Sequence, residues 1–330
     1  MDNRGPTPII RRVHSRPPRL AAWAAIMAVT GCGDERPRTA MLGPWNRPLA
    51  ERASDPFPRK LHQSDGTVIT IQSPPHRVVS GTILTDGVLL EVCPRERIRA
   101  LHRISTDPLY SPFAAESAKF PRHLSGEAEP MLAEEPDLVF VASFTRPETR
   151  DKLEKSGAVL VRVDDFESFP DIAGNLRMIG YALGLDAAVE QLVAQMEATL
   201  EQLGPGRARR SGWRVLLWSD GYSAGRDTLF QAMLDVIGAR NAAASLAGHA
   251  PLSVERALAL DPDVIVVGAP PGQEPAALER LRQTPGLASI RAVTTDRVLV
   301  VDSALLAATS QHAALAAKRI ADRLDVWGKP

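Results

Sequence analysis

Short runs of β-branched and aliphatic residues alternate along the chain with stretches in which hydrophobic residues recur at helical spacing. This alternation predicts an α/β protein with mainly parallel sheets, because each parallel strand needs a crossover, usually a helix, before the next one. The predicted strands are Thr67–Gln72, Arg77–Ser80, Ile98–His102, Leu138–Ala142 and Val159–Val163 in the first half, and Arg214–Trp218, Val264–Val267 and Val298–Val301 in the second.

Two segments of the chain repeat one another. Glu129–Val141 and Glu255–Val267 both read Glu, then Leu-Ala, then Pro-Asp, then a hydrophobic strand. A helix that ends before proline and leads into a strand is physically sensible, because proline disfavours helical backbone at the residue before it. The repeat predicts two similar lobes, each with its own sheet.

The longest helical pattern, over Asp171–Leu203, lies between these lobes and ends at Gly204-Pro205-Gly206. It predicts one long, stiff helix that joins them, with Gly180 and Gly184 as candidate break points near its start. The expected division is a first lobe over residues 63–170, a joining helix over 171–204 and a second lobe over 205–330.

The start of the chain has a different composition. Residues 1–31 hold five arginines and one acid, and the apolar run Leu20–Val29 is too short to span a bilayer. A basic start, a short apolar run and small residues are typical of a secretory signal. Val29-Thr30-Gly31-Cys32 resembles a bacterial lipobox, which implies cleavage before Cys32 and lipid attachment to its sulfur; a soluble secreted protein is the alternative. Residues 32–62, rich in proline and charge, are expected to form a flexible tether.

Overall composition narrows the function classes. The 330 residues include 39 basic and 39 acidic side chains, so the zero net charge excludes a strongly basic nucleic-acid binder. Two cysteines exclude a disulfide scaffold, and Cys93 is expected to be a small buried hydrophobic residue.

The order of these parts resembles the helical-backbone class (class III) of substrate-binding proteins of bacterial ABC importers, which includes vitamin B12-binding and ferric siderophore-binding proteins. The resemblance covers about residues 65–328 and also rests on Arg77–Ser80, Gly126–Val141, Leu153–Val161, Ile179–Gly184, Leu234–Asn241, Leu252–Val267 and Asp296–Asp302.

This resemblance implies two three-layer α/β lobes joined by a long helix, without enzymatic activity or a cofactor. It implies that a metal chelate (a ferric siderophore, a corrinoid or haem) binds between the lobes and is delivered to an ABC permease and its ATPase. It further implies a monomer in the periplasm or at the cell surface, anchored to the membrane by lipid, with no nucleic-acid partner.

In that family one glutamate of each lobe docks on arginines of the permease. By register with the Pro-Asp strands, Glu129 and Glu255 are the matching positions. The alternative is that each acid is only stabilised by the dipole at the start of a helix.

The ligand is expected in the cleft between the lobes, where loops follow the carboxyl ends of the strands. Aromatic side chains there would pack on a ring system or belong to the core, and arginines would pair with an anionic chelate. Candidates for an axial haem ligand are Tyr110, Tyr222 and His102. The candidate ligand-binding residues are Thr82, Thr85, Arg103, Tyr110, Phe144, Arg146, Trp218, Tyr222, Arg226 and Leu305.

A secreted serine hydrolase is the rival interpretation. Gly221-Tyr222-Ser223-Ala224-Gly225 fits G-x-S-x-G, and Asp296 or Asp302 and then His312 follow in the order that α/β-hydrolases use. Against it, Ser219 and Asp220 separate the predicted strand from the motif, so a sharp turn at the serine is not assured.

Overall fold

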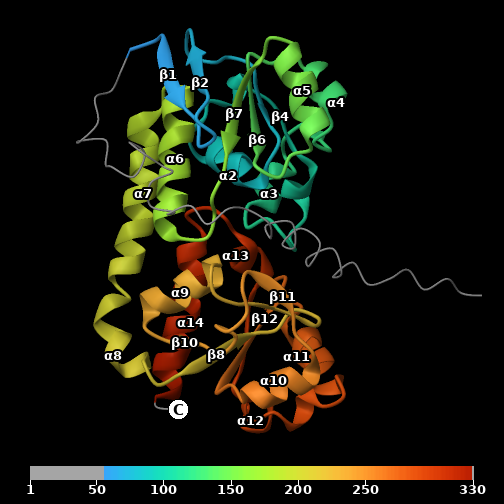
Figure 1. Cartoon of the computed structure of the whole chain (residues 1–330), viewed down its shortest axis with the longest axis vertical. Helices are drawn as coiled ribbons and strands as arrows, with labels where there is room; N and C mark the ends of the chain where they lie inside the picture. Colours follow the sequence, from blue (N-terminus) through green and yellow to red (C-terminus); the bar gives the residue numbers. More distant parts are fainter. Residues whose placement is uncertain (1–55, 329–330) are drawn as a thin grey trace, which may run out of the picture.

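The computed structural model describes residues 56–328, which form two α/β lobes stacked along the long axis of the molecule (Figure 1). The first lobe contains a five-stranded sheet in the order β5-β4-β3-β6-β7, and the second a four-stranded sheet in the order β10-β8-β12-β13. All pairings in both sheets are parallel, so the predicted fold class is confirmed. Cys32 and the predicted signal peptide lie outside the described residues.

The strands of the first lobe follow the predicted ones closely. Its sheet consists of β3 (Val78–Ser80), β4 (Ile98–His102), β5 (His123–Leu124), β6 (Leu138–Ala142) and β7 (Val159–Val163). Its helices are α2 (Ile83–Val92), α3 (Ala114–Ser117), α4 (Ala128–Leu132) and α5 (Pro147–Lys155), with 3-10 turns at Arg95–Arg97 and Arg103–Thr106.

One boundary of the first lobe differs from the prediction. The tether was expected to reach residue 62, but β1 (Arg59–His62) pairs with β2 (Val68–Ile71) in an antiparallel ribbon. The guanidinium of Arg59 donates to the carboxylate of Asp186 and to the carbonyl of Tyr181, both at 2.7 Å. These contacts, which include a buried ion pair, tie β1 to the segment that joins the lobes.

The second lobe repeats this plan. Its sheet consists of β8 (Arg214–Leu217), β10 (Arg240–Asn241), β12 (Val264–Ala269) and β13 (Val298–Asp302), beside the antiparallel pair β9 (Tyr222–Ala224) and β11 (His249–Pro251). Its helices are α9 (Leu229–Ile237), α10 (Val254–Leu260), α11 (Glu274–Gln283), α12 (Arg291–Thr294), α13 (Ser303–Ala307) and α14 (Ala313–Trp327), with a 3-10 turn at Leu287–Ser289. Within residues 56–328, none of the helices combines the length and the apolar character that a membrane span requires.

A long helix joins the two lobes, as predicted, but it runs over residues 186–210 and begins later than the expected Asp171–Leu203. α6 (Phe169–Leu183) ends at Gly184, whose φ of 73° is left-handed, and α7 (Asp186–Glu201) then starts in a new direction. A Cβ at Gly180 would lie 2.8 Å from the Cβ of Val189, so this glycine lets α6 and α7 lie side by side (Figure 1). From α7 a helical run continues through Gly204–Gly206 and α8 (Arg207–Arg210) into the second lobe.

Each central strand packs on helices on both faces, which makes three layers. In β6, Leu138 and Phe140 face one hydrophobic cluster, and Val139 and Val141 face another. In β12 the same alternation separates Val264 and Val266 from Ile265 and Val267. Because side chains of a strand alternate between faces, a wholly hydrophobic strand is typical of a sheet covered on both sides.

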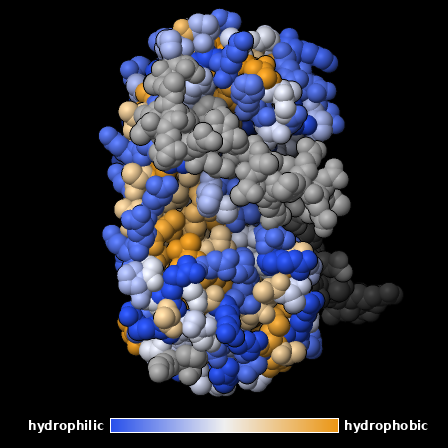
Figure 2. Space-filling view, turned by 60° about the vertical axis from the view of Figure 1, so that its left-hand side comes forward, coloured by the Kyte–Doolittle hydropathy of each residue, from blue (hydrophilic) through white to orange (hydrophobic). Residues whose placement is uncertain are grey.

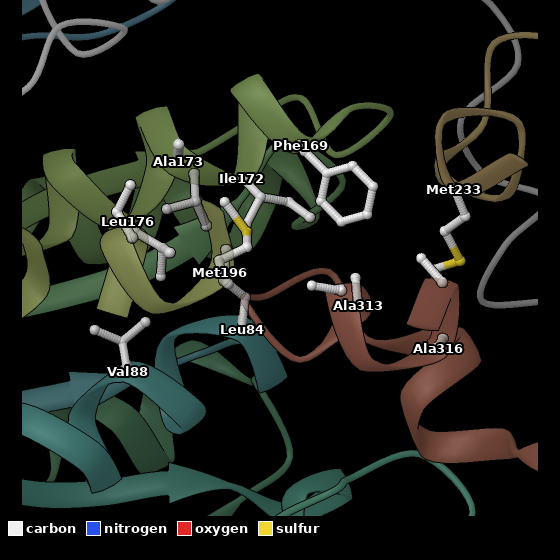
Figure 3. Packing of buried hydrophobic residues seen from close by; sticks show 14 of the residues in the cluster. Leu84, Val88, Phe169, Ile172, Ala173, Leu176, Met196, Met233, Ala313 and Ala316 are labelled. Atoms are coloured by element: carbon white, nitrogen blue, oxygen red, sulfur yellow. The ribbon is translucent and has the colours of Figure 1, made fainter. Parts of the chain in front are cut away.

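One hydrophobic core runs through both lobes. It includes Leu84 and Val88 of α2, Ile172 of α6 and Ala313 and Ala316 of α14, which lie close together in Figure 3. The small side chains at the start of α14 allow close approach. Rotation of the lobes would expose this surface at a cost of roughly 25 cal/mol per Å², so the core favours a fixed arrangement.

Candidate functional site: a cavity between the lobes

A cavity of about 530 Å³ lies between the two lobes. Its volume falls within the roughly 300–1,000 Å³ that small-molecule pockets occupy. The first lobe contributes the loop after β3, the end of β4 and the loop after β6, and the second contributes the end of β8 and the start of α9. The lining therefore gathers at the carboxyl ends of the strands, as expected for open α/β sheets.

The loop after β3 owes its position to local sequence. A Cβ at Gly81 would lie 2.7 Å from the carbonyl oxygen of Phe140, so only glycine allows the chain to leave β3 this close to β6. Thr82 then caps α2, because its hydroxyl accepts a hydrogen bond from the N–H of Thr85 at 3.1 Å. Strand end, tight turn and helix start thus place Thr82 in the cavity wall.

The cavity wall is mostly hydrophobic. Phe144 is 51% exposed, and its ring centroid lies 6.5 Å from that of Phe166 in a tilted arrangement. Large exposed aromatic residues at a concave site are typical of a binding surface. Figure 2 shows hydrophobic residues gathered midway along the molecule, with further hydrophobic groups near both ends. The hydrophobic lining residues also include Ile83, Leu84, Ile104, Leu217, Leu229, Phe230 and Leu306.

Two histidines line the cavity, one from each lobe. Burial, with the charge of Arg103, lowers the pKa of His102 to about 4, and burial also lowers the pKa of His249. Both imidazoles are therefore neutral at pH 7. Nδ1 of His102 accepts a hydrogen bond from the N–H of Ile104 at 3.3 Å, which assigns the ring hydrogen to Nε2. His102 accordingly has its one ring donor at Nε2.

A buried acid, Asp86, holds the backbone of His102 in place. Both carboxyl oxygens of Asp86 accept from the backbone N–H of His102, at 2.9 and 3.1 Å. Burial raises the pKa of Asp86 to about 8. The contact fixes the turn at Arg103–Thr106 against α2 and so positions the imidazole of His102.

The structure brings together four of the ten predicted ligand-binding residues, and each of these lines the cavity: Thr82, Tyr110, Phe144 and Arg146. The other six lie elsewhere. Thr85 is buried behind Thr82, Trp218 is 8% exposed in the second-lobe core, and Arg226 faces Asp227 at 3.7 Å. Arg103 is exposed, and Tyr222 and Leu305 are partly buried outside the lining.

Sequence reasoning missed most of the second-lobe wall. The unpredicted lining residues there include Leu217, Asp227, Thr228, Leu229, Phe230, His249, Ala307 and Thr309. A signal for part of this wall was present, because Thr228 and Gln231 have the spacing of a helix capping box. The hydroxyl of Thr228 caps α9 by accepting from the N–H of Gln231 at 3.2 Å.

The hydrolase interpretation is wrong. Ser223 lies within β9 at 2% exposure, and its hydroxyl has no hydrogen-bond partner among residues 56–328. His312 instead bonds to Glu91 at 2.9 Å, Asp296 pairs with Arg282 at 3.1 Å, and Asp302 caps α13. A serine nucleophile needs a base within hydrogen-bond reach, which Ser223 lacks.

Glu129 and Glu255 both lie on the surface, away from the cavity lining. The carboxylate of Glu129 pairs with the ammonium of Lys152 at 2.8 Å, and this hydrogen bond lowers the pKa of Glu129. The pKa of Glu255 is lowered by hydrogen bonds from its own backbone N–H and from the hydroxyl of Ser253. Both acids are thus exposed and ionised at neutral pH, each on a helix that precedes a Pro-Asp strand.

Comparison with known proteins agrees with this architecture. The sequence model of the family described as periplasmic binding protein matches residues 78–305. An uncharacterized ABC transporter substrate-binding lipoprotein of Bacillus subtilis, YvrC, is 24% identical over 302 residues, which cover 87% of this chain and 91% of the relative. A cobalamin-binding protein of Halobacterium salinarum is 26% identical over 66% of this chain and 60% of its own length. The periplasmic heme-binding protein RhuT of Roseiflexus sp. RS-1 superposes with a TM-score of 0.65 at 24% identity, over 76% of this chain and 97% of that one.

Proposed function

This chain belongs to the periplasmic binding protein family, and we propose that it is the substrate-binding component of an ABC importer for a metal chelate: a ferric siderophore, a corrinoid or haem. The observation that carries the proposal is the cavity of about 530 Å³, walled by hydrophobic and aromatic side chains of both lobes. A chelate buries its metal inside an organic shell, so hydrophobic contact and a few hydrogen bonds suffice to hold it.

The delivery route completes the proposal. The B. subtilis relative is a lipoprotein, which supports lipid attachment at Cys32 and a tethered position outside the cytoplasmic membrane. Glu129 and Glu255, one exposed acid on each lobe, would pair with cations of the permease and set the cavity over its entrance. Charged pairs at an interface rim chiefly guide docking and orientation.

Binding of defined chelates tests this function. The full chain, purified in detergent, is mixed in turn with a ferric trihydroxamate, a ferric tris-catecholate, cobalamin and haem, and the retained colour is measured after gel filtration. We expect at least one chelate to be retained at one equivalent per chain. Retention of none would contradict the proposal.

A matched pair of variants locates the binding site. Phe144 is 51% exposed in the cavity wall, and Val326 is 73% exposed on α14 outside it. Phe144→Ala should weaken binding by about tenfold, because aromatic residues at the centre of a site carry much of its affinity. Val326→Ala should leave affinity unchanged, and equal effects of the two substitutions would place the ligand elsewhere.

A further inference from the structure

A second, smaller pocket borders the main cavity on the side of the second lobe. It has a volume of about 50 Å³ and lies at the carboxyl ends of β8 and β12, beside α11 and the start of α13. Leu217 lines both spaces, and Leu109 of the small pocket precedes Tyr110 of the main cavity in sequence. Since one water needs roughly 10–15 Å³, the pocket has room for a small polar group but not for a whole chelate. A ligand in the main cavity would therefore enter it only with a side arm.

Two polar side chains of this small pocket are buried without a partner. Trp218 is 8% exposed and Ser303 is 2% exposed, and both line the pocket. Within residues 56–328, no group accepts a hydrogen bond from the indole N–H of Trp218, and none bonds to the hydroxyl of Ser303. Buried indole and hydroxyl groups usually have a hydrogen-bond partner, because leaving them unpaired costs free energy. Both groups are therefore available to a polar atom of a ligand.

Two charged side chains of opposite sign line the same pocket. Arg280 of α11 and Asp220, in the loop after β8, are both exposed, and neither forms an ion pair within residues 56–328. The guanidinium of Arg280 only donates hydrogen bonds, and the carboxylate of Asp220 only accepts them. The two charges offset one another, so the pocket favours neither an anion nor a cation. It suits a neutral group that both accepts and donates hydrogen bonds.

We propose that the small pocket binds a primary amide on a side arm of the ligand, and that the ligand is a corrinoid. This inference rests on the proposed function and narrows its ligand class. The amide oxygen would accept from the N–H of Trp218 and the hydroxyl of Ser303, and the amide nitrogen would donate to the carboxylate of Asp220. A carboxylate has no hydrogen to donate to Asp220, and an ammonium group cannot accept from Trp218. Corrinoids carry primary amides around the macrocycle, whereas haem carries carboxylates and the oxygens of hydroxamates and catecholates bind the iron.

Changes to single amides of the ligand test the proposal. Cobalamin is compared with each of its monocarboxylic acids, in which one side-arm amide is hydrolysed and the macrocycle is unchanged. In titrations on the full chain we expect one of these acids to bind about tenfold more weakly than cobalamin, and the others to bind within about twofold of it. Asp220→Asn should recover part of that loss, because it removes the carboxylate that would face the new acid. Equal affinity for cobalamin and all of its acids would overturn the inference.

Variants of the chain identify the groups responsible. Trp218→Phe keeps an aromatic ring and removes the N–H, and Ser303→Ala removes only a hydroxyl, so each should weaken cobalamin binding by about fivefold. Ser289→Ala, which removes an exposed hydroxyl of the second lobe outside both spaces, is the matched control and should leave affinity unchanged.

The outcomes separate this inference from the proposed function. Unchanged cobalamin affinity in both Trp218→Phe and Ser303→Ala would overturn the inference. Retention of a ferric siderophore or haem, with no binding of cobalamin, would also overturn it but would leave the proposed function standing. Failure of every chelate to bind would overturn both.

Discussion

The two lobes are alike at the amino ends of their strands. In the first lobe, Asp137 accepts from the backbone N–H of Arg77 at 2.9 Å and donates its own N–H to the carbonyl of Arg77 at 3.0 Å. In the second lobe, Asp263 and Arg214 make the same pair of bonds at 2.8 and 2.9 Å. These bonds fix β6 against β3 and β12 against β8. The aspartate at the amino end of each strand therefore has a structural role.

The lobes differ at the carboxyl ends of the same strands. The first lobe offers the cavity His102, Tyr110 and the pair Phe144 and Phe166, while the second offers mainly the start of α9 and the end of α13. A duplicated frame with unlike loops is typical of proteins in which sites are built on a common fold. Folding constraints therefore act at one end of the strands and ligand binding at the other.

The largest expected effect concerns the two exposed acids, which differ in pairing. Glu129→Gln together with Glu255→Gln should lower uptake by about tenfold or more, because both charges that we propose orient docking are lost. Uptake is measured in vesicles that carry the partner permease and ATPase, alongside ligand affinity, which should stay unchanged. Normal uptake by the double variant would contradict the docking role, and lost ligand binding would place these acids in the site.

Single substitutions sharpen this difference between the lobes. Glu129 must leave Lys152 before it can pair with a permease cation, whereas Glu255 has no ion-pair partner among residues 56–328. Glu255→Gln should therefore reduce uptake more than Glu129→Gln, and Lys152→Gln should strengthen docking. Equal effects of the two single substitutions would show that the Lys152 pair does not matter.

The next largest effect is on stability at the Pro-Asp junctions. Asp263 is 5% exposed and also pairs with Arg291 at 2.6 Å, so Asp263→Ala should lower the free energy of unfolding by about 3 kcal/mol. Asp137 is more exposed, and Asp137→Ala should cost about 1 kcal/mol. Denaturant titration measures both, with the exposed Asp151→Ala on α5 as control. A larger loss of unfolding free energy in Asp137→Ala than in Asp263→Ala would contradict this prediction.

A smaller effect depends on pH and belongs to the first lobe. The pKa of Asp86 is about 8 in the folded chain and 3.8 as its ordinary value, so between these values the folded state binds more protons than the unfolded one. Asp86 therefore makes stability fall as pH rises through this window, by at most about 1.4 kcal/mol per pH unit. His102, with a pKa lowered to about 4 from 6.5, acts in the opposite direction between those values.

Asp86→Asn separates these two contributions. The free energy of unfolding should then no longer fall between pH 6.5 and 8, and the rise due to His102 should remain below pH 6.5. Urea titration at a series of pH values measures the profile. An unchanged slope above pH 6.5 would show that Asp86 is already ionised in the folded state.

The strands and the repeat could be predicted from sequence because they depend on local pattern. Ile98–His102, Leu138–Ala142 and Val159–Val163 have the predicted bounds, and Cys93 is buried as expected. Gly184 was one of two candidate break points, and α6 ends there with left-handed backbone. Hydrophobic spacing continues through both glycines, so sequence did not show which of them ends the helix.

The cavity was predictable in position but only partly in content. Loops after the first-lobe strands gave Thr82, Tyr110, Phe144 and Arg146. His249 lies on β11, a strand that was not predicted from the sequence. It reaches the cavity because β11 pairs with β9. Which side chains of a loop point into the cavity depends on contacts between residues distant in sequence. The spacing of residues along the chain does not show these contacts.

The smallest expected effect is a change of shape when ligand binds. The helical run over residues 186–210 crosses between the lobes, and the core shared by α2, α6 and α14 would be exposed by a large rotation. We therefore expect the radius of gyration to change by less than about 1 Å between the free and bound chain, as in other pre-organised binding proteins. Small-angle scattering with and without the retained chelate measures this change in radius of gyration.

A core variant tests whether the shared core restrains the lobes. Val88→Ala, at a core position outside the cavity lining, should lower the free energy of unfolding by about 1 kcal/mol and enlarge the change in radius of gyration if the core restrains the lobes. A contraction of several ångströms in the unmodified chain would mean that the lobes hinge despite their shared core, and that one cavity shape does not serve both states.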